Sequence, residues 1–260
     1  MSSIPLHAPP YPTLRPVLHP YTCRRLPSLT VTCETSERVI REVLAPTPFE
    51  YLTKRFLISI LDFSDCQGFI PFKDVGVIIP VRYGDTTGGY YCYEYEDTEG
   101  SVIAGREWWG YPKKLAQIRI SFGKERITAS VRREGVRLID VTCELLSERE
   151  VTRLGSKIPT IPLYPHLTMQ VIPNAEGPGF FMKRIIARDT SIVSKVLVRK
   201  YGRAKISISR LASDPIYKML PVKILGSVYT VSDYKATWAK VLATIPGDSP
   251  EAKVLQMAPA

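Results

Sequence analysis

The sequence predicts a mainly β (α+β) fold built from antiparallel strands, and two observations carry this prediction. Eight runs of the 260-residue chain are rich in β-branched and aromatic residues, which favour strands. Short turn signals, such as Gly84-Asp85 and Glu134-Gly135, join several of these runs without an intervening helix. Strands connected in this way pair antiparallel and form a barrel or a sandwich. The predicted strands are residues 54–63, 75–83, 89–96, 116–122, 126–132, 136–145, 167–173 and 191–198.

Two segments have the periodicity of an amphipathic helix. Residues 36–45 place four aliphatic side chains on one face, with Ser36 as a possible N-cap and Pro46 beyond the end. Residues 232–244 place aromatic and aliphatic side chains on one face, and Ser232 is a possible N-cap. We therefore expect a few helices at the periphery of the strands.

The chain reads as one domain with two distinct ends. Six prolines fall within residues 1–20, which predicts an extended N-terminal arm. Residues 21–247 show no internal repeat or clean boundary and are predicted to form a single domain, followed by a tail at 248–260. The N-terminus lacks a secretory pattern, and no apolar stretch is long enough to span a bilayer, so we expect a cytoplasmic protein.

The net charge of +10 is unevenly distributed. Residues 61–110 are acidic, whereas residues 111–260 are basic, and their lysines and arginines occur in pairs and not in long runs. A nucleic-acid-binding arm or a membrane anchor usually has a denser basic cluster. The pattern favours contacts within a homo-oligomer and attraction of small anionic substrates over binding to nucleic acid or membrane.

The cysteines and histidines argue against a metal site. The five cysteines form no CxxC pair, and without a secretory context we expect reduced, mostly buried thiols. The three histidines lie far apart in the sequence, which disfavours a zinc site or a Ser-His-Asp triad. His166 is interpreted as an isolated surface or core residue.

Residues 105–115, Gly-Arg-Glu-Trp-Trp-Gly-Tyr-Pro-Lys-Lys-Leu, are the most unusual stretch of the chain. Two of the three tryptophans lie beside a lysine pair, Pro112 restricts the backbone before it, and Gly110 permits close approach of another chain or a ligand. Paired lysines on a turn are usually solvated. The large aromatic rings point instead to a pocket in which an amine loses its contact with water.

This stretch resembles the signature of the acetoacetate decarboxylase family, which is roughly Gly-Arg-Glu, three residues ending in Tyr, then Pro-Lys-Lys-Leu. Residues 172–177 and 215–227 also resemble family segments. The resemblance implies a β-cone or closed antiparallel barrel with a few helices, assembled into a homo-oligomer. It also implies an active site inside the cone that needs no cofactor and no metal.

The resemblance further implies that Lys113 forms a Schiff base with a keto substrate. Only a neutral amine can attack a carbonyl, so the pKa of Lys113 must fall from about 10.4 to about 6. Burial alone can lower a lysine pKa that far. If Lys113 and Lys114 lie on a strand, they point to opposite faces and Lys114 forms a structural ion pair. If they lie on a turn, the second amine joins the catalytic pair; we favour the strand.

The other expected site residues follow from the same resemblance. Asp74 occupies the place of the family's catalytic glutamate. Arg25 is the best match to the family's arginine near the substrate carboxylate, and Arg24 is the alternative. A second family carboxylate is missing, because Phe56 is followed by Leu57. The candidate catalytic residues are therefore Lys113, Lys114 and Asp74, and the candidate substrate-binding residues are Arg25, Glu107, Trp108 and Tyr111.

These residues predict a cofactor-independent carbon–carbon lyase. A β-keto acid condenses with Lys113, the protonated imine accepts the electrons released with CO2, and hydrolysis frees a ketone. Two alternatives remain open at this point: a Schiff-base aldolase-dehydratase acting on a pyruvate-like substrate, and a non-catalytic basic scaffold that binds an anion or a partner.

Overall fold

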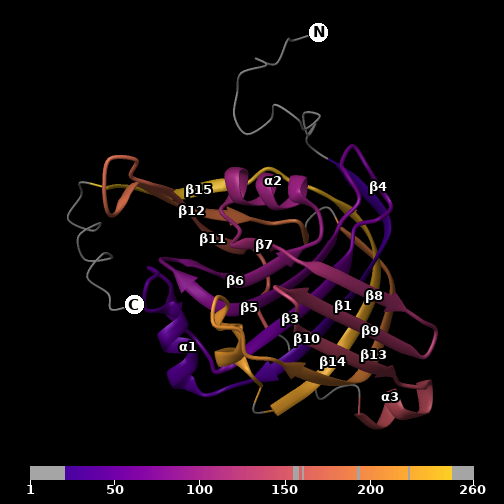
Figure 1. Cartoon of the computed structure of the whole chain (residues 1–260). Helices are drawn as coiled ribbons and strands as arrows, with labels where there is room; N and C mark the ends of the chain where they lie inside the picture. The colour runs from indigo at the N-terminus through magenta and orange to yellow at the C-terminus, as the bar shows by residue number, and fades with distance from the viewer. Residues whose placement is uncertain (1–20, 155–157, 160, 192–193, 222, 248–260) are drawn as a thin grey trace.

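The computed structural model describes residues 21–247 except 155–157, 160, 192–193 and 222 (Figure 1). The predicted N-terminal arm, residues 1–20, and the predicted tail, residues 248–260, lie outside the described residues. Within the described part of the chain, no helix has both the length and the apolar composition needed to cross a membrane.

The mainly β prediction is confirmed. Fifteen strands form one sheet, and most neighbours in it pair antiparallel. The strands are β1 (Thr22–Glu34), β2 (Glu50–Tyr51), β3 (Arg55–Asp62), β4 (Cys66–Gln67), β5 (Lys73–Tyr83), β6 (Thr86–Glu96), β7 (Lys113–Leu115), β8 (Gln117–Phe122), β9 (Arg126–Arg133), β10 (Val136–Leu145), β11 (His166–Pro173), β12 (Phe180–Arg188), β13 (Lys195–Ile208), β14 (Lys223–Lys235) and β15 (Lys240–Pro246).

The expected closed barrel is not confirmed. Hydrogen-bonded neighbours run in the order β15-β12-β11-β6-β5-β3-β1-β14-β13-β10-β9-β8, and among the described strands the two ends of this order do not pair. The sheet instead curls so that β8 packs near β5, and apolar side chains from both fill one core (Figure 1). The pairs β6–β7 and β6–β11 are parallel, so the sheet is mixed.

The central strands have two buried faces with different chemistry. On β5, Val75 and Val77 belong to the large apolar core, whereas Asp74 and Gly76 face the opposite side. Side chains alternate between faces along a strand, so β1 and β3 repeat this division. Their aliphatic residues enter the core, and their serines and threonines line a cavity on the other face. The site described below lies on this second face.

One of the two helix predictions is confirmed and the other is wrong. Helix α1 (Glu37–Leu44) begins after Ser36, whose side chain accepts a hydrogen bond from the backbone N–H of Val39 at 3.3 Å. Residues 232–244 instead belong to the end of β14, the linking segment and β15. Pairing of β14 with both β1 and β13 outweighs the local helical periodicity, and Tyr, Thr and Val suit strands equally well.

Two further helices were not predicted. Helix α2 (Glu99–Trp109) contains two glycines, which weaken a helical pattern in the sequence, and α3 is short (Glu148–Leu154). Trp108 and Trp109 therefore lie on the last turn of a helix. Helix α2 ends at Gly110, whose φ of 66° is a left-handed C-cap that glycine adopts without strain. A Cβ there would lie 2.8 Å from the Cβ of Gln170, so the close approach predicted at this glycine is confirmed.

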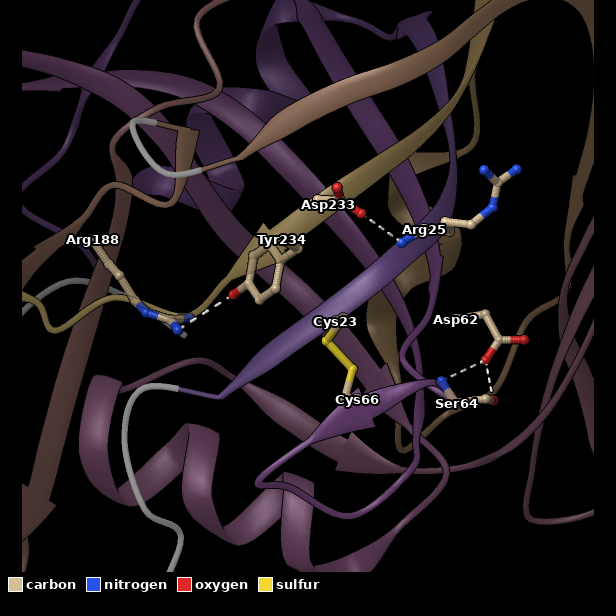
Figure 2. Close-up of a disulfide and its surroundings, with 8 residues drawn as sticks. All are labelled: Cys23, Arg25, Asp62, Ser64, Cys66, Arg188, Asp233 and Tyr234. Carbon is tan, nitrogen blue, oxygen red and sulfur yellow. Dashed lines mark hydrogen bonds between the residues drawn. A yellow bond between two sulfur atoms is a disulfide. The ribbon is translucent and has the colours of Figure 1, made fainter.

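The expectation of fully reduced cysteines is wrong for one pair. Cys23 on β1 and Cys66 on β4 form a disulfide, which Figure 2 shows beside the cavity residue Tyr234. The two residues are 43 positions apart in the sequence and meet because β4 pairs with β1. Cys33, Cys92 and Cys143 are free thiols, as expected.

Candidate active site

Strand register brings four charged side chains to one point. Asp74 on β5 lies opposite Glu96 on β6, and Glu94 lies two residues earlier on the same face of β6. Strand β7 pairs in parallel with β6 and sets Lys113 opposite Glu94. The Lys113 side chain is only 10% exposed and the three carboxylates are buried still more deeply.

The Lys113 ammonium is surrounded by acidic and aromatic groups. Its Nζ donates a hydrogen bond to Glu96 and lies 3.7 Å from Glu94 Oε1 and 4.0 Å from Asp74 Oδ2. The ring of Tyr111 lies 5.3 Å from Nζ on another side. Each carboxylate retains one buried oxygen that has no hydrogen-bond partner among the described residues. This arrangement favours keeping protons within the cluster.

The carboxyl groups titrate far above their usual range. Burial raises the pKa of Glu94 and that of Glu96 to about 7, although the charge of Lys113 opposes the rise. Burial, reinforced by the charge of Glu94, raises the pKa of Asp74 well above its ordinary value. Glu94 and Glu96 can therefore gain and lose protons near neutrality.

The expectation that desolvation lowers the pKa of Lys113 is wrong. Burial does lower this pKa, but Glu94, Glu96 and Asp74 together raise it above its ordinary value. Lys113 must therefore pass its proton to a neighbour before it can attack a carbonyl. Glu96 is bonded to the ammonium and has a pKa close to 7, so it is placed to accept that proton.

Lys114 is not part of the site. Because β7 is a strand, Lys114 points to the opposite face, as the favoured arrangement predicts. There its Nζ lies 3.0 Å from Asp214 Oδ2, and the hydroxyl of Tyr95 donates to the other oxygen of Asp214 at 2.9 Å. Lys114 is thus a structural ion-pair residue, and its place among the candidate catalytic residues is withdrawn.

Helix α2 packs directly against Lys113. A Cβ built on Gly105 would overlap the methylene groups of Lys113 and lie 2.9 Å from its Nζ. Only glycine at this helix position leaves room for the lysine side chain. The Gly-Arg-Glu part of the signature therefore has a steric role beside Lys113.

Replacing Gly105 with alanine should displace the Lys113 amine while leaving the fold intact. We expect Schiff-base formation to slow by about 100-fold, because misplacing a reacting group by about 1 Å has an effect of this size. The rate of borohydride-dependent adduct formation on Lys113 measures it. Gly177→Ala is the matched control, since a Cβ at Gly177 meets no atom within 4 Å. Equal rates in both variants would contradict the steric role.

Two predicted substrate-binding residues lie outside the cavity. Glu107 is exposed on α2, and among the described residues it forms no ion pair with Arg106 or Lys114. Trp108 stacks edge-on against Trp109, with centroids 5.4 Å apart, and packs within an apolar cluster. Neither side chain is among those that line the cavity beside Lys113.

Tyr111 and Asp74 are found where the sequence analysis expects them. Both line a cavity of about 330 Å³ together with Lys113. The hydroxyl of Tyr111 also lies 2.9 Å from Nδ1 of His166, a buried residue at the start of β11. The interpretation of His166 as an isolated residue is therefore wrong, because it belongs to the cavity wall.

Arg25 does not reach the cavity, and a different arginine does. Strand β1 has a register shift between Cys23 and Leu26, where Arg25 adopts a φ of 52° and its exposed side chain extends away from Tyr234 and Arg188 (Figure 2). Its rival, Arg24, is exposed as well. Arg188 at the end of β12 is buried and lines the cavity.

The acidic cluster also offers oxygens for a cation. Ligand atoms of Asp74, Glu94 and Glu96 lie within 4.8 Å of one another, a spacing that could hold a metal ion. The Lys113 ammonium already contacts all three groups. In this arrangement the protein's own side chain supplies the positive charge that these carboxylates attract.

Sequence reasoning missed four residues of the cavity region: Glu94, Glu96, His166 and Arg188. The alternation Glu-Tyr-Glu at the end of a predicted strand was a usable signal, because residues two apart share a face. His166 and Arg188 carried no such local signal. Their position depends on which strands pair with β11 and β12.

Comparisons with known proteins agree with this architecture. Residues 3–245 match the family model described as acetoacetate decarboxylase (ADC). The acetoacetate decarboxylase of Burkholderia multivorans is 25% identical over 245 residues, which cover 89% of each chain. A crystal structure of acetoacetate decarboxylase from Legionella pneumophila matches with a TM-score of 0.74 and 21% identity, over 86% of this chain and 88% of that one.

Another similar structure is that of a protein with a different name. The enduracididine biosynthesis enzyme MppR, complexed with pyruvate, matches with a TM-score of 0.68 and 14% identity, over 89% of this chain and 92% of that one. This similarity concerns the fold alone. Because the family model covers nearly the whole chain, the protein belongs to the acetoacetate decarboxylase family.

Proposed function

We propose that the protein is a cofactor-independent decarboxylase that acts on a β-keto acid through a Schiff base at Lys113. The observation that carries this proposal is a buried lysine amine, on the wall of a cavity, bonded to a carboxylate whose pKa is about 7. An amine that only stabilised the fold would not need a cavity of about 330 Å³ in front of it.

The residues support each step of this reaction. Glu96 takes a proton from the Lys113 ammonium, and the neutral amine adds to the keto carbon of the substrate. Loss of water gives a protonated imine, which accepts the electron pair of the breaking carbon–carbon bond as CO2 leaves. Asp74 and Glu94, both on the cavity wall, are placed to return a proton to the resulting enamine carbon. Water then hydrolyses the imine and releases the ketone.

A second candidate reaction uses the same lysine. An aldolase-dehydratase would form the imine with a pyruvate-like acid and use the enamine as a nucleophile toward an aldehyde. The observation that favours it is the similarity of fold to MppR, which has been solved with pyruvate and with the condensation product of pyruvate and imidazole 4-carboxaldehyde.

Borohydride trapping tests the proposal. The protein is incubated with a panel of β-keto and α-keto acids, reduced, and digested for mass spectrometry. We expect a reduced adduct on Lys113, together with release of CO2 from a β-keto acid. A condensed or dehydrated product with pyruvate and an aldehyde, without CO2, identifies the second reaction. If no carbonyl compound becomes attached to Lys113, the chain is a binding scaffold and the proposal is wrong.

A further inference from the structure

Arg188 is a buried cation facing the cavity without an acidic partner. Arg188 is only 6% exposed, and it forms no ion pair with a carboxylate among the described residues. Its Nε donates to the backbone carbonyl of Thr237 at 3.0 Å, and another guanidinium nitrogen donates to the hydroxyl of Tyr234 at 3.4 Å (Figure 2). The guanidinium also stacks 4.0 Å from the ring of Trp109. These contacts orient the group, and the carboxylate of Glu94 interacts with its charge only from beyond ion-pair distance.

A second unsatisfied nitrogen lies on the same wall. Nε2 of His166 is buried and has no hydrogen-bond partner within the described part of the chain. Burial, then the charges of Arg188 and Lys113, lower the pKa of His166 to about 3, so its ring is neutral. A neutral imidazole has one N–H, and the partner of Nδ1 decides which nitrogen carries it.

Tyr111 determines that choice. Burial, its largest influence, raises the pKa of Tyr111 despite the nearby charge of Arg188, so the phenol keeps its proton. We assign the Tyr111 O–H as the donor to Nδ1 of His166, 2.9 Å away, because Arg188 interacts with the Tyr111 oxygen and can only donate to it. The proton of His166 is then on Nε2, the unpartnered atom. Arg188 and His166 thus provide a charge and a neutral N–H donor on one wall.

We infer that Arg188 and Nε2 of His166 bind a second carboxylate of the substrate, which stays in the product. This inference rests on the proposed function and names its substrate class: a β-keto acid that carries a further carboxylate. An arginine and a neutral N–H together match the two oxygens of a carboxylate. The cavity would then have a reacting end at Lys113 and an anchoring end at Arg188.

The carboxylate held by Arg188 cannot be the one that leaves. Decarboxylation removes negative charge from the carboxylate as the bond breaks, so a cation bound to that group stabilises the starting state more than the transition state. An arginine there would slow the loss of CO2. The leaving carboxylate must therefore lie elsewhere, and the Arg188 end suits a group whose charge does not change. For the probe β-ketoadipate, this predicts CO2 and levulinate as the products.

The test compares β-ketoadipate with acetoacetate, which has no second carboxylate. We expect kcat/KM of the wild-type protein to be at least about 30-fold higher for β-ketoadipate, the size expected for one charge-assisted contact. In Arg188→Met this ratio should fall toward one, whereas Arg188→Lys should retain part of it. His166→Phe should lower the ratio by a smaller factor, about 5-fold, because a neutral donor contributes less.

Arg184→Met is the matched control. Arg184 belongs to the same strand but does not line the cavity, so we expect the ratio to stay at the wild-type value. A second measurement uses a dicarboxylate as a competitor. Glutarate should protect Lys113 from reductive trapping of acetoacetate at least about 10-fold more effectively in the wild-type protein than in Arg188→Met, because only the wild-type cavity offers its second carboxylate a cation.

The outcomes separate this inference from the proposed function. If acetoacetate is trapped on Lys113 but the ratio is near one in the wild-type protein, or is unchanged by Arg188→Met, the second-carboxylate site is wrong and the Schiff base stands. Equal protection of the wild-type protein and of Arg188→Met by glutarate also overturns the site. If neither keto acid is trapped on Lys113, the proposed function itself fails.

Discussion

Replacing Lys113 with methionine should abolish borohydride trapping of keto acids and lower turnover by at least about 10⁴-fold, because no other group can form the imine. The reason is positional as well as chemical. Lys114 is the nearest lysine in the sequence, yet it lies on the other face of β7 and is bound to Asp214. It cannot substitute for the missing amine. Residual CO2 release measured by gas detection gives the size of the loss.

Lys114→Met is the matched control for this variant. It removes the same side chain one position away, and we expect most of the trapping to remain. This variant should instead lower stability, because it leaves the buried Asp214 with fewer partners. Breaking a fully buried ion pair costs of the order of 3 kcal/mol, and Lys114 is partly exposed, so the loss should be smaller. Arg133, at 3.5 Å, and Tyr95 still contact Asp214 and reduce that loss. Equal loss of trapping in both folded variants would show that the strand does not separate the two amines.

The free energy of unfolding should decrease as the pH rises from about 4.5 to about 7. Burial raises the folded-state pKa of Glu94 and Glu96 to about 7 from an ordinary value of 4.5, so the folded protein binds more protons than the unfolded chain in this window. The stability that these two groups contribute is then fully present below the unfolded-state pKa of about 4.5 and is lost as the pH rises through the folded-state pKa of about 7. We expect a change of the order of 3 kcal/mol for each of the two groups, measured by urea unfolding at several pH values.

Neutral isosteres test the assignment of this slope. In the double variant Glu94→Gln/Glu96→Gln neither side chain can titrate, so most of the decrease between these pH values should disappear. Arg203 and Glu150 form an exposed ion pair far from the site in sequence, and Glu150→Gln serves as the control that should keep the wild-type slope. A slope that survives in the double variant would assign the pH dependence to other groups.

Much of the fold could be predicted because its signals are local. The runs that became β3, β5, β6, β8, β9, β10 and β11 were placed to within a few residues, since β-branched and aromatic residues mark strands wherever they pair. The N-cap at Ser36 was placed for the same reason, because a cap depends on residues within one turn. The helix predicted at residues 232–244 is wrong because the local pattern suits a helix, whereas the strands that pair with this segment, β1, β12 and β13, lie far away in the chain.

By itself, the sequence identified Lys113 as the candidate Schiff-base lysine, through its resemblance to the family signature. It also favoured the separation of Lys113 from Lys114, because two neighbours on a strand face opposite ways. The environment of that lysine was decided by tertiary structure. Glu94 and Glu96 reach it through the register of β6 with β7, and a bulge in β1 turns Arg25 outward while β12 supplies Arg188. Charges act through space, so the pKa of Lys113 depends on which strands pair with β7 and β6. The residues next to Lys113 in the sequence do not reveal this pairing, because it joins segments that are distant in the chain.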